Sequence, residues 1–188
     1  MSEPAAYRPP EVGASWGNRA VAASYRHRPS YPPQTFDLLA ELITDDAPAV
    51  LDLGCGTGFI TRPLAQRVQR VDAVDISAAM IEEGKRLPGG DHPGITWIVG
   101  RAEDVALRSP YALVTTGDSL HWMEWGVVLP RLTDALSPAG WLAILSADGT
   151  LVTEDPAVQQ GILDLTERYS TYSRPKVCLL YTSPSPRD

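Results

Sequence analysis

The sequence lacks the features that mark several large classes of protein. It has two cysteines, Cys55 and Cys178, which are too few and too far apart for a disulfide framework or a cysteine-based metal site. No apolar run approaches the roughly 20 residues of a membrane-spanning helix. Residues 1–13 have neither the basic nor the apolar region of a secretory signal. We therefore expect a cytoplasmic protein that binds no metal and spans no membrane.

Positive charge is also scarce. The 188 residues include 16 Lys and Arg against 23 Asp and Glu, which gives a net charge of -7. The basic residues form no cluster, so the electrostatics argue against a nucleic-acid partner. The length suits one α/β domain and is too short for two full ones. The composition, 44% hydrophobic and 21% charged, is ordinary for a globular protein.

Strand-like and helix-like segments alternate along the chain. Apolar runs typical of short strands occur at residues 49–53, 70–74, 95–99, 111–115 and 141–145. Helical segments are expected at residues 18–28, 34–43, 58–68, 78–86 (with Ser77 as N-cap), 120–136 (interrupted or bent near Gly126 and Pro130) and 156–169, and a turn at residues 137–140. This alternation predicts an α/β fold with helices on both faces of a parallel sheet.

A glycine-rich loop follows the first predicted strand. Gly54, Gly56 and Gly58 stand at alternate positions directly before a helical segment. Glycine permits unusual backbone angles and lets a ligand approach the main chain. Phe59 stands where a dinucleotide fingerprint needs a small residue, and the Lys-Ser/Thr ending of a phosphate-binding P-loop is absent. The loop therefore predicts a nucleotide-like cofactor that is neither a nicotinamide dinucleotide nor a nucleoside triphosphate.

Polar residues also follow the other predicted strands. Asp75 ends the second strand, where a carboxylate can accept both hydroxyls of a ribose. The third strand runs into residues 100–104, whose backbone groups are suited to an adenine edge, and the fourth runs into residues 116–122. Open α/β sheets bind ligands at the carboxyl ends of their parallel strands. We therefore expect one ligand site along this edge.

Four segments in this order resemble the motifs of a known family. Residues 50–58, 71–77, 100–105 and 119–122 are similar to those of class I S-adenosylmethionine-dependent methyltransferases of the small-molecule type, with a methyltransferase domain 11/25-like pattern. The match covers about residues 25–148. It implies a Rossmann-like doubly wound parallel sheet of order 3-2-1-4-5, with five strands present and the family's final two-strand hairpin missing.

The resemblance also implies S-adenosyl-L-methionine as cofactor and assigns roles to residues. The implied cofactor-binding residues are Asp52, Gly54, Gly56, Gly58, Asp75, Ile76, Ala102, Glu103 and Gly117. Asp118 and His121 are candidate catalytic bases, and Arg101 stands where the family often has Asp. The lead-in at residues 25–33 is similar to that of a subgroup that includes trans-aconitate-methyltransferase-like proteins.

Several candidates have a purely structural alternative. Asp52 fits a turn near a helix N-terminus, Asp75 fits a simple cap, and His121 fits a structural histidine beside tryptophans. Cys55 is expected to be a small packing residue. Arg28 and Tyr31 are candidates to contact the cofactor carboxylate or an acidic substrate.

The leading functional hypothesis is methyl transfer to an unidentified small molecule by in-line displacement. An alternative is a non-catalytic module on the same fold that binds S-adenosylmethionine, S-adenosylhomocysteine or a partner, because fold does not determine function. A third possibility, a nicotinamide-dependent dehydrogenase, is disfavoured by Phe59. The sequence does not indicate an oligomeric state.

Composition and the family resemblance together imply four regions in the chain. Residues 1–33 form a partly disordered cap or lead-in, 34–150 the cofactor-binding core, and 151–177 a helix that leads to a missing C-terminal part. Residues 178–188 match, residue for residue, one reading frame of a transposon-type sequencing-library adapter, so we expect a fragment whose natural sequence departs near Val177. The strand at 141–145 would then be an open, aggregation-prone edge.

Overall fold

The computed structural model describes residues 14–45, 48–146 and 160. The chain divides into two compact units, and all structural statements below concern the unit Tyr7–Ser146, which is described from residue 14 onward. The tail at 178–188 and, apart from Gln160, the helix expected at 156–169 lie outside the described residues. The expected region boundaries therefore remain predictions.

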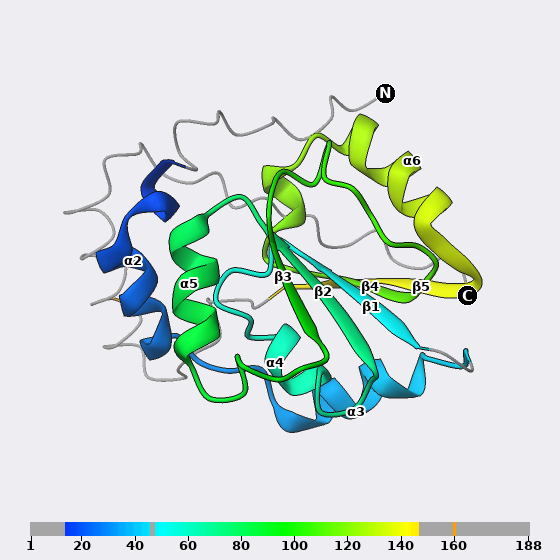
Figure 1. Cartoon of the computed structure of the whole chain (residues 1–188), viewed down its shortest axis with the longest axis horizontal. Helices are drawn as coiled ribbons and strands as arrows, with labels where there is room; N and C mark the ends of the chain where they lie inside the picture. The colour runs from blue at the N-terminus through cyan, green and yellow to red at the C-terminus, as the bar shows by residue number, and fades with distance from the viewer. Residues whose placement is uncertain (1–13, 46–47, 147–159, 161–188) are drawn as a thin grey trace. The chain divides into compact units, whose positions relative to one another are not determined.

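A parallel sheet of five strands forms the centre of this unit (Figure 1). The strands are β1 (Ala49–Leu53), β2 (Arg70–Asp75), β3 (Ile95–Val99), β4 (Tyr111–Gly117) and β5 (Leu136–Leu145). Their order is β3-β2-β1-β4-β5, and every pairing is parallel. This arrangement confirms the Rossmann-like α/β fold and the strand order expected from the sequence.

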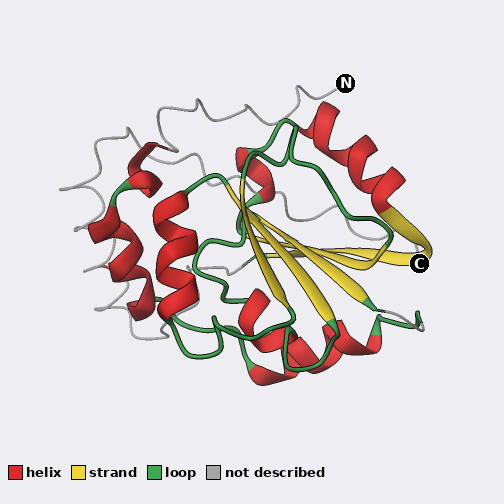
Figure 2. Cartoon of the chain, in the orientation of Figure 1, coloured by secondary structure: helices red, strands yellow, loops and turns green. Residues whose placement is uncertain are grey.

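Helices cover both faces of the sheet (Figure 2). The α-helices are α2 (Arg19–Ser24), α3 (Pro33–Glu41), α4 (Thr61–Leu64), α5 (Ala78–Arg86) and α6 (Trp125–Ala135), and the 3-10 helices are η1 (Ala14–Gly17), η2 (Tyr25–His27) and η3 (Leu120–Trp122). Helices α3 and α4 pack with Val50 on one face, and α6 packs with Leu51 on the other. Neighbouring strand residues point to opposite faces, so β1, buried throughout, contributes to both cores.

Three predicted elements differ from the structure. The helix expected over 58–68 is only the short α4, because the N–H groups of Gln66 and Arg67 bond three residues back and tighten the chain into turns. The segment expected to be helical over 120–136 is two pieces, η3 and α6. The interruption expected near Gly126 comes just before that residue, and α6 continues through Pro130. Glu124 at the break is extended, and its N–H is taken by the Glu103 carboxylate.

The third difference is the turn expected at residues 137–140, which lies inside β5. The register shifts there, so that Tyr111 pairs with Leu136 while Leu113 pairs with Trp141. A Cβ at Gly140 would lie 2.8 Å from the Tyr111 carbonyl oxygen, so only glycine fits this close approach. The turn residues are thus absorbed as an irregularity in the strand.

A buried polar network ties β2 to β4. Asp72 is fully buried and accepts a hydrogen bond from the Tyr111 hydroxyl at 2.8 Å. The Arg108 guanidinium also donates to this carboxylate, with Nε at 3.1 Å. Buried charges are tolerated when they are paired and hydrogen-bonded in this way. Within the described ranges, the helices are all too short or too polar to cross a membrane.

Candidate functional site

The glycine loop is fixed to the end of β2. The N–H groups of Gly54 and Cys55 both donate to the Val74 carbonyl, at 2.8 and 3.0 Å, and Gly58 N–H donates to the Cys55 carbonyl at 2.8 Å. Gly54, Gly56 and Gly58 have positive φ angles of 66°, 55° and 82°. Side chains rarely adopt these angles, which explains three glycines at alternate positions.

The three glycines face different surroundings. A Cβ at Gly54 would lie 2.4 Å from the Ser119 Cβ, and one at Gly58 would lie 2.6 Å from the Trp97 ring. A Cβ at Gly56 would meet nothing within 4 Å. Gly54 and Gly58 therefore permit internal packing, whereas Gly56 presents bare backbone on an open side where a ligand can approach.

Asp75 joins the glycine loop to the start of α5. Its Oδ2 accepts the Gly56 N–H at 2.7 Å, and its Oδ1 accepts the Ser77 N–H at 2.8 Å. Burial raises the pKa of Asp75, and the two backbone hydrogen bonds oppose that rise. Each carboxylate oxygen has a second lone pair for a further donor. The expected ribose-binding residue thus lies directly beside the open glycine.

Asp52 lies beneath the loop and is only 1% exposed. Its two oxygens accept hydrogen bonds from the hydroxyls of Thr61 at 2.5 Å and Thr115 at 2.9 Å. Burial raises the pKa of Asp52 to about 6, although the threonine hydrogen bonds act in the opposite direction. Asp52 therefore connects β1, α4 and β4, and its expected cofactor contact remains a prediction.

Asp118 follows β4 in a left-handed backbone conformation, with φ of 50°. Its N–H donates to the Leu145 carbonyl at 2.9 Å, and its side chain accepts from Arg28 at 3.3 Å and from the Ser146 hydroxyl at 3.1 Å. At Gly117, a Cβ would lie 2.9 Å from the Tyr31 hydroxyl. Arg28 and Tyr31 are thereby brought to the carboxyl end of β4.

The remaining sequence candidates lie around the same edge. His121 is exposed on η3, with its ring 5.2 Å from that of Trp122. Ile76 is 62% exposed directly after Asp75, and Ala102 packs against the core. Glu103 accepts the Glu124 N–H at 2.9 Å, so it holds the start of α6. The structure brings these residues to one edge of the sheet without showing what they bind.

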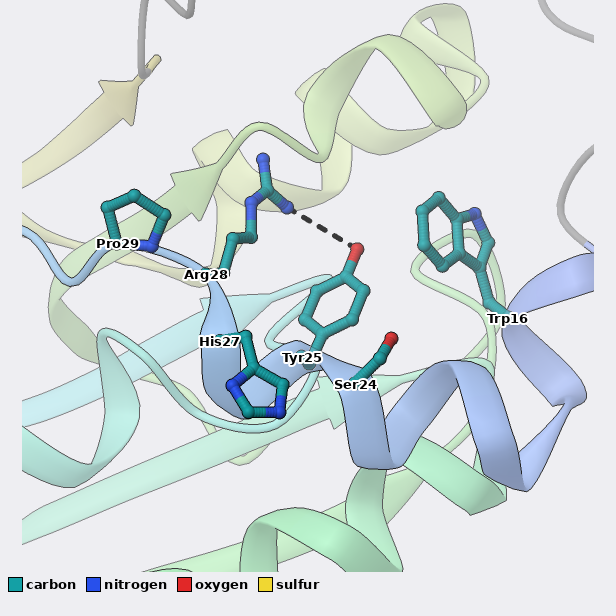
Figure 3. A pocket seen from close by; sticks show the side chains of 6 residues that line it. All are labelled: Trp16, Ser24, Tyr25, His27, Arg28 and Pro29. Atoms are coloured by element: carbon teal, nitrogen blue, oxygen red, sulfur yellow. Dashed lines mark hydrogen bonds between the residues drawn. The ribbon is translucent and has the colours of Figure 1, made fainter. Parts of the chain in front are cut away.

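The segment 14–29 brings Trp16, which the sequence reasoning missed, together with Arg28, which it named as a candidate. The Trp16 carbonyl accepts the Ser77 hydroxyl at 2.7 Å, and the Trp16 ring meets those of Tyr25 and Trp122 edge-on at 5.5 and 6.4 Å. An open cleft of about 520 Å³ lies here (Figure 3), lined by Trp16, Ser24, Tyr25, His27, Arg28 and Pro29. A lone tryptophan in a Pro/Ala/Gly-rich stretch was the available signal.

The fold and the site first define a class. A doubly wound sheet with a glycine loop after β1 and a carboxylate after β2 is a nucleotide-cofactor-binding α/β protein. Comparison with known families narrows this class, because a family model described as a methyltransferase domain matches residues 50–140. The chain belongs to the class I S-adenosylmethionine-dependent methyltransferase family, as its sequence motifs implied.

Individual relatives agree with this family. An uncharacterized methyltransferase of Mycobacterium bovis is 32% identical over 136 residues, covering 72% of this chain and 53% of the relative. The trans-aconitate 2-methyltransferase of an Azoarcus species is 35% identical over 111 residues, covering 57% of this chain and 42% of the relative. A solved structure of a proposed type II methyltransferase from Anaeromyxobacter dehalogenans has a TM-score of 0.64 and 28% identity, with coverage of 80% and 62%. The chain thus spans about half the length of the curated relatives it matches.

Proposed function

We propose that this chain transfers a methyl group from S-adenosyl-L-methionine to a small-molecule acceptor. The observation that carries the proposal is the juxtaposition of Gly56 and Asp75. Gly56 offers open backbone, and the Asp75 carboxylate, 2.7 Å from the Gly56 N–H, retains lone pairs for ribose hydroxyls. A nucleoside with an extended amino-acid arm suits this arrangement, because its ribose would meet the carboxylate while its arm lies along the open loop.

When bound, the cofactor supplies an activated methyl group on a sulfonium sulfur. The residues of the chain therefore chiefly orient the two reactants for an in-line displacement. Asp75 would accept hydrogen bonds from the ribose hydroxyls, and Gly54, Gly56 and Gly58 would let the loop lie close to the methionine arm. Asp52 holds the loop from beneath through its threonine partners. An acceptor with a removable proton needs a base, for which Asp118 and His121 are the candidates.

The remaining cofactor contacts complete this proposal. Ile76 and Ala102 would contact the adenosine, Glu103 would lie near the adenine edge, and Gly117 would leave the end of β4 clear of a side chain. We propose a cytoplasmic location and a small-molecule acceptor for the whole protein. The relatives named trans-aconitate 2-methyltransferase and N-demethylindolmycin N-methyltransferase leave the reacting acceptor atom open.

A turnover assay tests the proposal. S-adenosyl-L-methionine is mixed with the protein and a panel of carboxylic acids, amines and phenols, and formation of S-adenosylhomocysteine is followed. We expect acceptor-dependent product that Asp75→Ala reduces by about tenfold or more, as loss of hydrogen bonds to a charged group does. Asp91→Ala, in an exposed loop, is the matched control. Cofactor binding without turnover on any acceptor would favour the non-catalytic alternative.

A further inference from the structure

The cleft lined by residues of the segment 14–29 differs in charge from the chain as a whole. The protein carries a net charge of -7, yet none of the six lining residues within the described part of the chain is acidic. The lining combines one permanent cation, Arg28, with two aromatic rings, Trp16 and Tyr25, that meet at 88°. Figure 3 shows the Arg28 guanidinium beside the Tyr25 hydroxyl, with Trp16 across from that ring. Such a lining suits a small organic anion.

Arg28 is held only loosely by its present partners. Its guanidinium donates single hydrogen bonds of 3.3 Å to the Tyr25 hydroxyl and to the Asp118 carboxylate. Both contacts are longer than the 2.7–2.9 Å typical of a strong charge-assisted pair. The Arg28 side chain is 48% exposed, so solvent screens the ion pair. A guanidinium in this state has donors to spare for a bidentate carboxylate.

Asp118 has hydrogen-bond partners other than Arg28. It also accepts the Ser146 hydroxyl at 3.1 Å, and its backbone is fixed by the hydrogen bond to Leu145. Its side chain is 20% exposed. Withdrawal of the guanidinium would therefore leave a carboxylate that still has a donor and contact with water.

The cleft adjoins the cofactor edge. Arg28 donates hydrogen bonds to both the Tyr25 hydroxyl and the Asp118 carboxylate, so the cleft reaches the carboxyl end of β4. The hydrogen bond from Ser77 to the Trp16 carbonyl fixes the opposite wall to the start of α5. A molecule in the cleft would thus lie next to the proposed ribose site.

We propose that the cleft is the acceptor subsite and that Arg28 selects acceptors that carry a carboxylate. On binding, the guanidinium exchanges Asp118 for the acceptor carboxylate, and Trp16 and Tyr25 contact the acceptor's carbon skeleton. The anchored carboxylate is distinct from the atom that is methylated, since pairing with Arg28 would reduce its nucleophilicity. This inference rests on the proposed function and adds a substrate class to it.

The experiment measures acceptor binding separately from cofactor binding. The protein is saturated with S-adenosylhomocysteine and titrated by calorimetry with acetate, succinate, citrate and trans-aconitate, with the trimethyl ester of trans-aconitate as an uncharged match. The variants are Arg28→Gln and Arg28→Lys. Arg26→Gln is the matched control, because Arg26 lies on the same turn, is exposed and does not line the cleft.

We expect at least one carboxylate to bind and the ester not to bind. Arg28→Gln should lower the affinity for that carboxylate by about tenfold or more, and Arg28→Lys should lower it less. Arg26→Gln should leave the affinity within about twofold of wild type. Added salt should weaken it as well. Affinity for S-adenosylhomocysteine should stay constant in all variants, which also shows that they fold.

Three results would overturn the inference. The first is that no carboxylate binds the loaded wild-type protein, and the second is that binding survives Arg28→Gln. The third is that Arg28→Gln weakens the binding of S-adenosylhomocysteine instead, since Arg28 would then bind the carboxylate of the cofactor. Failure of the wild-type protein to bind S-adenosylhomocysteine at all would be a failure of the proposed function, so the two failures are distinguishable.

Discussion

Replacement of Asp52 by asparagine isolates the energetic effect of one buried carboxylate. Asp52 is 1% exposed and accepts hydroxyl hydrogen bonds from Thr61 and Thr115. An asparagine amide has nearly the same shape, and one threonine hydroxyl can rotate to accept its N–H group. The substitution therefore removes the ionisable group while its neighbours keep their partners.

The sign of the effect follows from the pKa. Burial raises the pKa of Asp52 from 3.8 to about 6, so the folded protein binds this proton more tightly than the unfolded chain. The stability that the group contributes is fully present below the unfolded pKa and is lost as pH rises through the folded one. At about 1.4 kcal/mol per pKa unit, the loss is roughly 3 kcal/mol. Asp52→Asn should therefore become increasingly more stable than wild type as pH rises over this window.

Urea unfolding between about pH 4.5 and pH 7.5 measures this difference. Other carboxylates titrate in the same window, but they cancel when Asp52→Asn is compared with wild type at each pH. Asp91→Asn, in an exposed loop, is the control for loss of a carboxylate at the surface. A pH-independent difference for Asp52→Asn, or one that favours wild type as pH rises, would refute the reasoning.

Three further predictions concern the loop, the buried network and the sheet edge. Gly54→Ala should destabilise the fold more than Gly56→Ala in thermal melts, because both strain a positive φ but only the first meets a side chain within 3 Å; equal losses would contradict this. Tyr111→Phe removes a hydrogen-bond donor to buried Asp72, so it should lower the free energy of unfolding in urea by about 1–3 kcal/mol. An unchanged unfolding midpoint would contradict this. Ile144→Lys, at a side chain 62% exposed on β5, should reduce concentration-dependent association in light scattering, and unchanged association would count against an adhesive edge.

The fold was predictable where local patterns act alone. The bounds of β1, β3 and α5 were predicted correctly, because compact apolar runs and the Ser77 cap define them within a few residues. An interruption near Gly126 was also expected, but the exact position of the break before α6 was not, because Glu124 there is held by a hydrogen bond to Glu103, which is far away in the sequence. The spacing of apolar residues along the sequence does not reveal a long-range contact of this kind.

The site was predictable at the level of residue types and strand ends. Asp75 and Gly56 stand beside each other as the parallel topology requires. Their geometry was not predictable, since the sequence does not show that Gly56 is open while Gly54 is packed. The contribution of Trp16 was missed because it arises from tertiary contact with α5.

The affinity of the protein for S-adenosylhomocysteine tests the central claim most directly. Calorimetry should show binding at one site, weakened about tenfold or more by Asp75→Ala and unaffected by Asp91→Ala, and no binding of NAD. Asp75 lies 2.7 Å from the Gly56 N–H, so its loss removes both the proposed ribose acceptor and the support of the loop. A folded wild-type protein that fails to bind S-adenosylhomocysteine, or that binds it equally well without the Asp75 carboxylate, would contradict the account.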